Sequence, residues 1–177
     1  MQSDGGKQEE RRASGTLLYT VAERARRDAT VWTLVQGVLA PIQFVIFAVS
    51  LGLVVRFLAT GEGLAAATFS VILKTLALYT IMVTGAIWEK VVFGRYLFAP
   101  AFYWEDVFSM IVIALHTAYV AALLLDIGSD RSRLILALAA YATYVINAGQ
   151  FILKLRAARL EGRPRDAVSS TGFGQVA

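Results

Sequence analysis

Four long apolar stretches dominate the pattern of hydrophobic and polar positions along the chain. They cover residues 31–55, 63–88, 107–125 and 134–153, and only Lys74 places a lysine, arginine or acidic residue inside one of them. About 20 residues of α-helix cross a hydrocarbon core of about 30 Å. Because backbone groups in lipid must find their hydrogen bonds within the protein, the pattern predicts an all-α, polytopic membrane protein with four transmembrane helices.

Polar segments flank this region on both sides. Residues 1–30 are expected to form a cytoplasmic N-terminal segment, in which the capping-box pattern that starts at Thr20 predicts a short amphipathic helix over residues 21–28. Residues 31–155 then form the four-helix transmembrane domain. Residues 156–177 are expected to be a cytoplasmic tail that is disordered at its end, because they are rich in polar residues and glycine.

Composition agrees with a membrane protein and narrows its chemistry. Of the 177 residues, 57% are hydrophobic and 17% are charged, whereas an average soluble chain is about 25% charged. The chain has no cysteine and a single histidine, which excludes thiolate metal sites, iron–sulfur clusters and multi-histidine centres within one chain. We therefore expect no metal site of the protein's own.

Lysine and arginine residues are distributed unevenly between the two sides of the predicted membrane domain. Four spans place both termini and the loop between the second and third spans on one side. Thirteen Lys and Arg residues fall on that side, and three fall on the other. The positive-inside rule then places both termini in the cytoplasm. The net charge of +4 is thus explained by topology, and no nucleic-acid partner is expected.

Polar residues within the predicted spans gather in the half nearer the cytoplasm. Gln36 and Gln43 share one face of the first span, and Asn147, Gln150 and Lys154 share a narrow face of the fourth. One interpretation is a polar pocket between the helices that opens to the cytoplasmic surface. The alternative is that these side chains hold the helices together through interhelical hydrogen bonds.

Two ionisable groups lie deeper in the predicted bilayer. Lys74 falls in the outer half of the second span, where we expect its long side chain to extend outward. His116 follows Glu105 by eleven residues, which places it about 16 Å deeper on the same helix face. An intramembrane histidine is a functional candidate, although a neutral histidine bonded to a neighbouring helix fits equally well. The separation excludes direct contact between His116 and Glu105 within one chain.

The segment between the second and third spans, residues 89–106, combines aromatic and charged residues. Its aromatic rings form either an interfacial belt or a cover over a flat hydrophobic ligand, and they are Phe93, Tyr96, Phe98, Phe102, Tyr103 and Trp104. Lys90 and Arg95 either follow the positive-inside rule or bind a ligand carboxylate. Acidic residues stand at both ends of the segment and are candidates for acid–base chemistry.

This segment also carries a resemblance to a known family. The string WEKVVFGRYLFAPAFYWEDVFSM, residues 88–110, is similar to the 3-vinyl (2-vinyl) bacteriochlorophyllide hydratase family of bacteriochlorophyll biosynthesis. Shorter matching strings occur at residues 24–30, 34–37, 40–41, 115–119 and 139–148. The resemblance extends over residues 19–160.

The resemblance implies a hydro-lyase that adds water across the C3 vinyl group of a chlorophyllide or bacteriochlorophyllide, giving a 1-hydroxyethyl group. It implies no cofactor, because magnesium enters only as part of the tetrapyrrole substrate. The expected location is a bacterial inner, photosynthetic membrane. Expected partners are the magnesium chlorin or bacteriochlorin pigment, the lipid bilayer, other enzymes of the same biosynthesis and a second copy of the chain in a homodimer.

The implied reaction suggests roles for the candidate residues. Glu105 or Asp106 is predicted to be the general acid–base, with Glu89 as the third candidate. His116 is predicted to be the axial ligand of the pigment's magnesium or a second proton-transfer group, and Lys90 or Arg95 the partner of its propionate. The other predicted substrate contacts are Tyr96, Phe102, Trp104, Gln36, Gln43, Asn147 and Gln150.

Two other classes of function stay open at this level. One is a haem-binding electron carrier, which would need two chains to share one haem between their His116 residues. The other is a non-catalytic pigment-binding subunit or assembly factor. An enzyme and a pigment carrier both need an aromatic site and a magnesium ligand, so turnover is the property that separates them.

Overall fold

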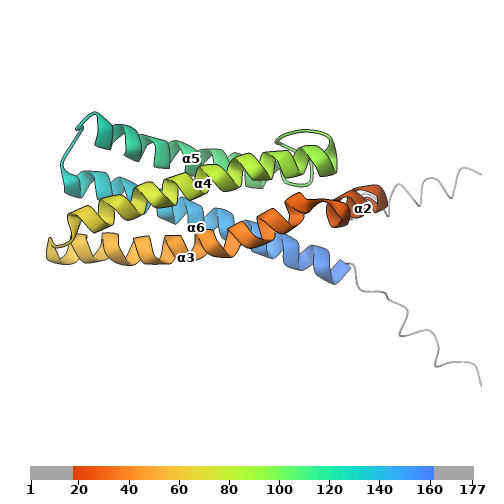
Figure 1. The fold of residues 1–177 in the computed structure, drawn as a ribbon, viewed down its shortest axis with the longest axis horizontal. Helices are drawn as coiled ribbons and strands as arrows, with labels where there is room; N and C mark the ends of the chain where they lie inside the picture. The colour runs from red at the N-terminus through yellow and green to blue at the C-terminus, as the bar shows by residue number, and fades with distance from the viewer. Residues whose placement is uncertain (1–17, 162–177) are drawn as a thin grey trace, which may run out of the picture.

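The chain folds into an all-helical bundle, seen in a computed structural model that describes residues 18–161, with side chains to residue 156. Within that part of the chain the helices are α2 (Val21–Ala29), α3 (Val31–Thr60), α4 (Leu64–Phe93), α5 (Tyr103–Leu124) and α6 (Asp130–Glu161). The four long helices run antiparallel, and α2, the loop of residues 94–102 and the end of α6 lie at one end of the bundle (Figure 1).

The four predicted spans are confirmed as helices long and apolar enough to cross a membrane. Each helix extends past the predicted apolar run, because polar residues continue the same helix beyond the hydrocarbon region. The last helix continues to Glu161, into what the sequence suggests is a tail. The remainder of the predicted tail, and residues 1–17 of the predicted N-terminal segment, lie outside the described residues.

The predicted short helix is also confirmed. The hydroxyl oxygen of Thr20 accepts a hydrogen bond from the backbone nitrogen of Glu23 at 3.3 Å, and the Glu23 carboxylate accepts one from the Thr20 nitrogen at 2.8 Å. This reciprocal capping box starts α2. The Arg26 guanidinium then donates to the carbonyl of Val92 at 2.7 Å, which ties α2 to the end of α4.

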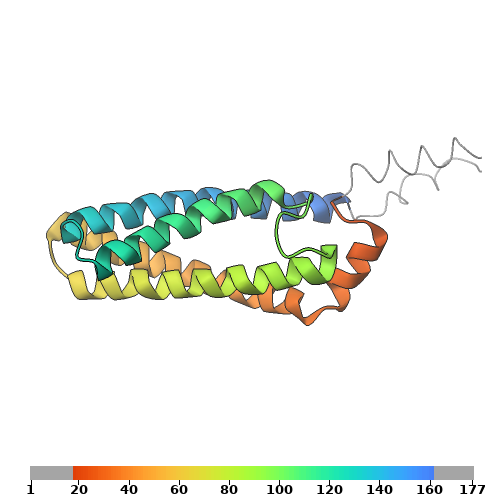
Figure 2. The ribbon, with the colours of Figure 1, turned by 90° about the horizontal axis from the view of Figure 1, so that it is seen from above.

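The bundle consists of two helical hairpins. α3 packs mainly on α4 and α5 mainly on α6, with fewer contacts between the two pairs. Figure 2 shows the α5–α6 pair running alongside the α3–α4 pair. Both hairpin turns lie at the end opposite α2, and Gly61 and Gly63 make the first turn in left-handed backbone conformations that suit glycine.

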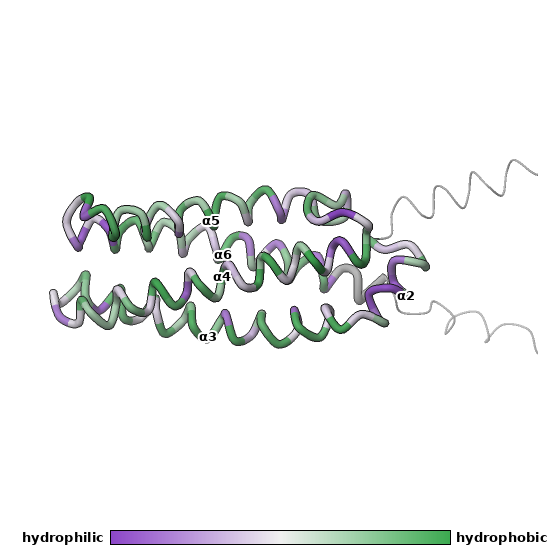
Figure 3. The backbone as a smooth tube through the Cα atoms, turned by 45° about the horizontal axis from the view of Figure 1, so that its top comes forward, coloured by the Kyte–Doolittle hydropathy of each residue, from purple (hydrophilic) through white to green (hydrophobic). Residues whose placement is uncertain are grey.

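The outward surface of the long helices is apolar. Large hydrophobic side chains such as Val45 and Phe69 are well exposed on this surface. Figure 3 shows hydrophobic residues along all four long helices and hydrophilic residues concentrated in α2. A soluble protein rarely leaves apolar surface this extensive in water. The exposed faces are therefore suited to contact with lipid.

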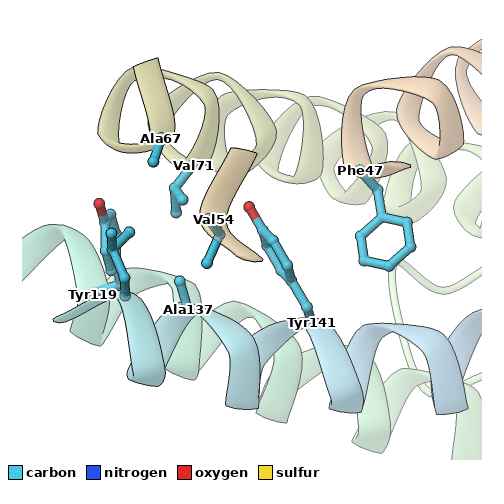
Figure 4. Close-up of a cluster of buried hydrophobic side chains, with 8 residues drawn as sticks. Phe47, Val54, Ala67, Val71, Tyr119, Ala137 and Tyr141 are labelled. Carbon is cyan, nitrogen blue, oxygen red and sulfur yellow. The ribbon is translucent and has the colours of Figure 1, made fainter. Parts of the chain in front are cut away.

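The apolar interior lies in the half of the bundle far from α2. Small residues let the helices approach closely there, with Ala67 on α4 and Ala137 on α6 fully buried (Figure 4). The Tyr141 hydroxyl, within this cluster, shares a hydrogen bond of 2.6 Å with the Ser50 hydroxyl, which in turn shares one of 2.7 Å with Ser70. These bonds connect α6, α3 and α4.

Candidate active site

Three acidic side chains meet at the α2 end of the bundle. Glu89 stands near the end of α4, and Glu105 and Asp106 stand in the first turn of α5, because the loop of residues 94–102 turns the chain back on itself. All three are buried. The carboxyl groups of Glu89 and Asp106 are hydrogen-bonding neighbours. The structure thus brings together all three residues predicted as acid–base groups, and pairs two of them.

The same two carboxyl groups hold the loop in place. An Asp106 oxygen accepts a hydrogen bond from the Phe98 backbone nitrogen at 2.7 Å, and a Glu89 oxygen accepts one from the Ala99 nitrogen at 3.3 Å. Phe98 has a φ of 58°, a left-handed conformation that is unfavourable for a residue other than glycine. The bond to Asp106 helps to stabilise that conformation, so the loop and the carboxyl pair form one unit.

Glu105 has a different partner. Its carboxylate forms an ion pair of 2.7 Å with the Lys154 ammonium, which connects α5 to α6. Each of the two side chains thereby gains a partner of opposite charge. Lys154 is absent from the residues predicted for the site, although its position on the polar face of the fourth span was a signal that could have included it. We call Glu89, Glu105, Asp106 and Lys154 the carboxyl cluster.

Aromatic rings pack beside the carboxyl cluster. Phe102 is buried, its ring stacks on Phe151 with centroids 5.8 Å apart, and the Lys154 ammonium lies 5.0 Å from its centroid. Tyr96 and Trp104, also predicted to contact substrate, are 61% and 67% exposed. Of these three predicted aromatic contacts, only Phe102 therefore belongs to the interior. The exposed rings have the placement expected of an interfacial belt.

Tyr19 is a buried member of this region that the candidate list did not include. Its ring stacks on Phe93 with centroids 5.8 Å apart and lies beside Phe102. Burial raises the pKa of the Tyr19 hydroxyl, against the opposing effect of Arg27, so the phenol stays protonated. No periodicity could have identified Tyr19, because it precedes the first helix and reaches the cluster only through the docking of α2.

The two basic residues near the loop, Lys90 in the last turn of α4 and Arg95 in the loop itself, are exposed. The Lys90 ammonium donates to the Gly94 carbonyl at 2.9 Å, at the C-terminal end of α4, where a cation complements the helix dipole. It lies 5.3 Å from the centroid of the exposed Tyr96 ring. Arg95 is exposed as well. Neither side chain is part of the buried carboxyl cluster.

The four predicted amide residues differ in how many of their polar atoms have hydrogen-bond partners. Gln36 donates to the Thr84 hydroxyl at 2.7 Å and Asn147 donates to the Ser109 hydroxyl at 2.8 Å, so each connects two helices. This agrees with the interpretation of these residues as interhelical links. Among the described residues, however, the Gln43 Nε2, Asn147 Oδ1 and Gln150 Oε1 atoms are buried without a hydrogen-bond partner. Buried polar atoms without partners are uncommon and indicate a role beyond packing.

His116 lies deeper, and its hydrogen bonding defines its tautomer. The Nδ1 atom is 2.8 Å from the Val112 carbonyl oxygen. Because a carbonyl can only accept, Nδ1 carries the hydrogen, and a neutral imidazole then has a free lone pair on Nε2. Nε2 is buried and has no partner among the described residues. His116 and Glu105 stand on one continuous helix, eleven residues or about 16 Å apart, so the predicted absence of direct contact between these two residues agrees with the structure. Asp106 is ten residues, or about 15 Å, from His116.

The prediction for Lys74 is wrong. The side chain does not extend toward the outer surface: it is 0% exposed, and its ammonium lies 3.6 Å from the centroid of the Tyr144 ring on α6. The reason is helix packing, since Val71, Thr75 and Leu78 on the same face of α4 are buried as well. A lysine on the buried face of a packed helix has no path along the lipid to the interface.

The chain is similar to known proteins over most of its length. The sequence matches the family described as 2-vinyl bacteriochlorophyllide hydratase over residues 19–157. The chain belongs to this family. A curated 2-vinyl bacteriochlorophyllide hydratase of Rhodobacter capsulatus is 71% identical over 154 residues, which are 87% of this chain and 90% of that protein. Another, of Cereibacter sphaeroides, is 71% identical over 145 residues, or 81% of this chain and 89% of that protein.

No solved structure matches the chain. The carboxyl cluster, the loop, Lys74 and His116 all lie within the residues that match the 2-vinyl bacteriochlorophyllide hydratase family. The resemblance inferred from residues 88–110 is therefore confirmed. The 2-vinyl group of the family name is the C3 vinyl group in the other ring numbering of the macrocycle.

Proposed function

We propose that this protein hydrates the vinyl group of a chlorophyllide or bacteriochlorophyllide, converting it to a 1-hydroxyethyl group. The observation that carries the chemistry is the contact between the Glu89 and Asp106 carboxyl groups in a buried, aromatic-lined site. The substrate follows from the family, whose curated members are named for a vinyl bacteriochlorophyllide. The reaction makes the protein a hydro-lyase that acts on a tetrapyrrole within a membrane-spanning bundle.

The reaction needs an acid and then a base at one place. Protonation of the terminal vinyl carbon leaves a cation on the carbon attached to the macrocycle, whose conjugated system delocalises the charge. A water oxygen then bonds to that carbon, and the extra proton on the oxygen returns to the protein. The elements of water are added without net electron transfer, so we propose that no redox cofactor takes part.

Glu89 and Asp106 suit the two roles better than Glu105 does. Two carboxyl groups in hydrogen-bonding contact favour a state in which they hold one proton between them, which provides one acid and one base at the same place. Glu105, paired with Lys154, is the less suitable proton donor. The ion pair is instead expected to hold α5 against α6 beside the reacting groups.

His116 is proposed to ligate the magnesium of the pigment. Its Nε2 lone pair is available, and the hydrogen bond from Nδ1 to the Val112 carbonyl fixes the ring, as such bonds do for metal-binding histidines in metalloproteins. The distance along α5 between His116 and Asp106 then requires the macrocycle to lie lengthwise in the bundle, with its vinyl edge toward the α2 end. Gln43, Asn147 and Gln150 could offer their unpartnered amide atoms to polar substituents of the ring.

The experiment that tests the function uses isotopically labelled water. Detergent-purified protein is incubated with 3-vinyl chlorophyllide and with 3-vinyl bacteriochlorophyllide, and the pigments are analysed by mass spectrometry. We expect each turnover to add one labelled water, and none to be added by a variant in which Glu89 and Asp106 are both amides. Pigment that binds and stays unchanged would contradict the proposal, and would favour a pigment-binding subunit.

The membrane topology is a separate proposal, namely a bacterial inner membrane with both termini in the cytoplasm. The chain has no native cysteine, so single cysteines report on topology directly. We expect a membrane-impermeant maleimide added outside cells with a permeabilised outer membrane to label Ser129→Cys, in the α5–α6 turn, and to leave Ala25→Cys, on α2, unlabelled. Both positions are exposed, so lysed cells provide the control in which both should react. Labelling of Ala25→Cys alone in intact cells would reverse the topology.

A further inference from the structure

Lys74 is a buried cation that the acid–base chemistry at the carboxyl cluster leaves unused. Its ammonium is fully buried and has no hydrogen-bond partner among the described residues. The face of the Tyr144 ring, 3.6 Å from the ammonium, supplies a cation–π contact but accepts no full charge. An ionised group buried in an apolar interior without a counter-ion is very unfavourable. The site therefore lacks an anion.

The described part of the chain cannot supply that anion. On α4 itself the one acidic residue is Glu89, fifteen residues or about 22 Å along the helix. The acids on α5 stand beside Glu89, and the acids at the opposite end, Asp126 and Asp130, pair with Arg133. α3 contains no acidic residue, and Glu62 in the turn between α3 and α4 pairs with Arg56. Lys74 is thus far from every described carboxylate.

Neighbouring polar groups are either already hydrogen-bonded or carry no negative charge. The Ser50, Ser70 and Tyr141 hydroxyls bond to one another, so they form a closed set. His116 on α5 and Lys74 on α4 contact neighbouring tyrosines of α6, because the His116 ring lies 5.7 Å from the centroid of Tyr141 and the Lys74 ammonium lies against Tyr144. The free Nε2 lone pair of His116 accepts hydrogen bonds or binds a metal, but does not neutralise a cation. Two unpartnered groups of complementary chemistry, a cation and a metal ligand, therefore face one region between α4, α5 and α6.

We propose that Lys74 binds the propionate carboxylate of the pigment and thereby selects pigments that carry a free acid over their esters. This inference rests on the proposed function, because the "-ide" pigments named for the family carry a free propionate that the esterified pigments lack. A pigment held by His116 at its magnesium would place a rim substituent within reach of a side chain beside that histidine. The charge pair would form away from water, where it is strong. Lys74 in this way replaces Lys90, which is exposed at the end of α4, and Arg95, which is exposed on the loop.

The test compares a free-acid pigment with its methyl ester. Equilibrium binding of magnesium chlorophyllide and of its methyl ester is measured through the pigment absorbance, without reference to turnover. We expect the natural protein to bind the acid roughly 30-fold more tightly than the ester, the loss typical of removing one partner of a buried charge pair. Lys74→Gln should bind both within about threefold, because it has no charge to lose.

Lys90→Gln, on the same helix but exposed, is the matched control and should keep the preference. Equal binding of acid and ester by the natural protein would overturn the proposal, and would be the result if a fatty-acid carboxylate occupied Lys74 instead. A preference kept in Lys74→Gln or lost in Lys90→Gln would overturn it as well. If Lys74→Gln fails to fold, Lys74→Met is used in its place, because the methionine side chain is unbranched and of similar length.

A second measurement separates this inference from the proposed reaction. If the Lys74 ammonium is unpaired without pigment, Lys74→Met should raise the melting temperature of the pigment-free protein, since removing an unpaired buried charge is stabilising. The variant should also show a smaller further rise in melting temperature when chlorophyllide is added. A lower melting temperature for the empty variant would contradict the argument. Binding that selects the acid without any hydration would refute the hydratase and leave the Lys74 site standing.

Discussion

Asp106→Asn is expected to lower kcat for vinyl hydration by about 10²–10⁴-fold, the range for removing a general acid–base group. The substitution removes the acid but keeps the loop contact, because the amide oxygen of asparagine can still accept the hydrogen bond from the Phe98 nitrogen. Glu89→Gln likewise keeps an acceptor for the Ala99 nitrogen. The loop should therefore stay in place, and KM should change little. Rates with both pigments, measured beside pigment binding, check this separation.

The double variant tells whether the two carboxyl groups act as a unit. Residues that share one chemical task give strongly non-additive losses. We therefore expect Asp106→Asn with Glu89→Gln to be little slower than the worse single variant. Losses that multiply would instead mean that the two groups act independently.

Glu105→Gln is the matched control, because it removes a carboxyl group one residue away. It removes the ion pair with Lys154 and leaves the Glu89 and Asp106 carboxyl groups, with the proton that they share, intact. We expect a loss of kcat of about tenfold or less, together with a lower melting temperature, since the Lys154 ammonium is left with no carboxylate partner. If Glu105→Gln abolished hydration while both other single variants worked at the natural rate, Glu105 would be the acid.

The sequence predicted the helices well because each of them is specified locally. Long uncharged runs define the four spans, and the capping box at Thr20 depends on two residues three positions apart. The acidic candidates were also accessible, since Glu89, Glu105 and Asp106 mark the ends of one short segment. Which of them form a pair was not accessible, because that depends on how the loop folds. The charge of Lys154 reaches Glu105 across 49 positions of sequence.

Lys74 shows the opposite limit. A lone lysine in an apolar run is compatible both with extension toward the interface and with burial, and helix period alone does not decide between them. What decides is the contact of that face of α4 with Tyr144 on α6, seventy positions away. The same contact between distant helices gives His116 and Lys74 a common region. Sequence therefore identified the unusual residues, whereas packing decided which of them meet.

His116→Phe is expected to weaken binding of the magnesium pigment by about 100-fold. Removing only the hydrogen-bond partner of a metal-binding side chain can already cost that much, and here the ligand itself is removed. The phenyl ring fills the space of the imidazole but has no lone pair. The absorbance change that accompanies axial ligation of magnesium should disappear as well. Binding isotherms and spectra of chlorophyllide with purified natural and variant protein provide the measurement.

The magnesium-free pigment separates ligation from packing. If His116 ligates magnesium, the natural protein should prefer the magnesium pigment over its magnesium-free form, and His116→Phe should bind the two forms about equally. Thr117→Ala, which alters the next residue and removes a hydrogen bond to Tyr79, should keep the preference. If His116 only packs in the bundle interior, His116→Phe should instead weaken binding of both pigments by the same factor. That result would leave the carboxyl pair without a partner at the pigment's centre, and the macrocycle would have to be held by its rim alone.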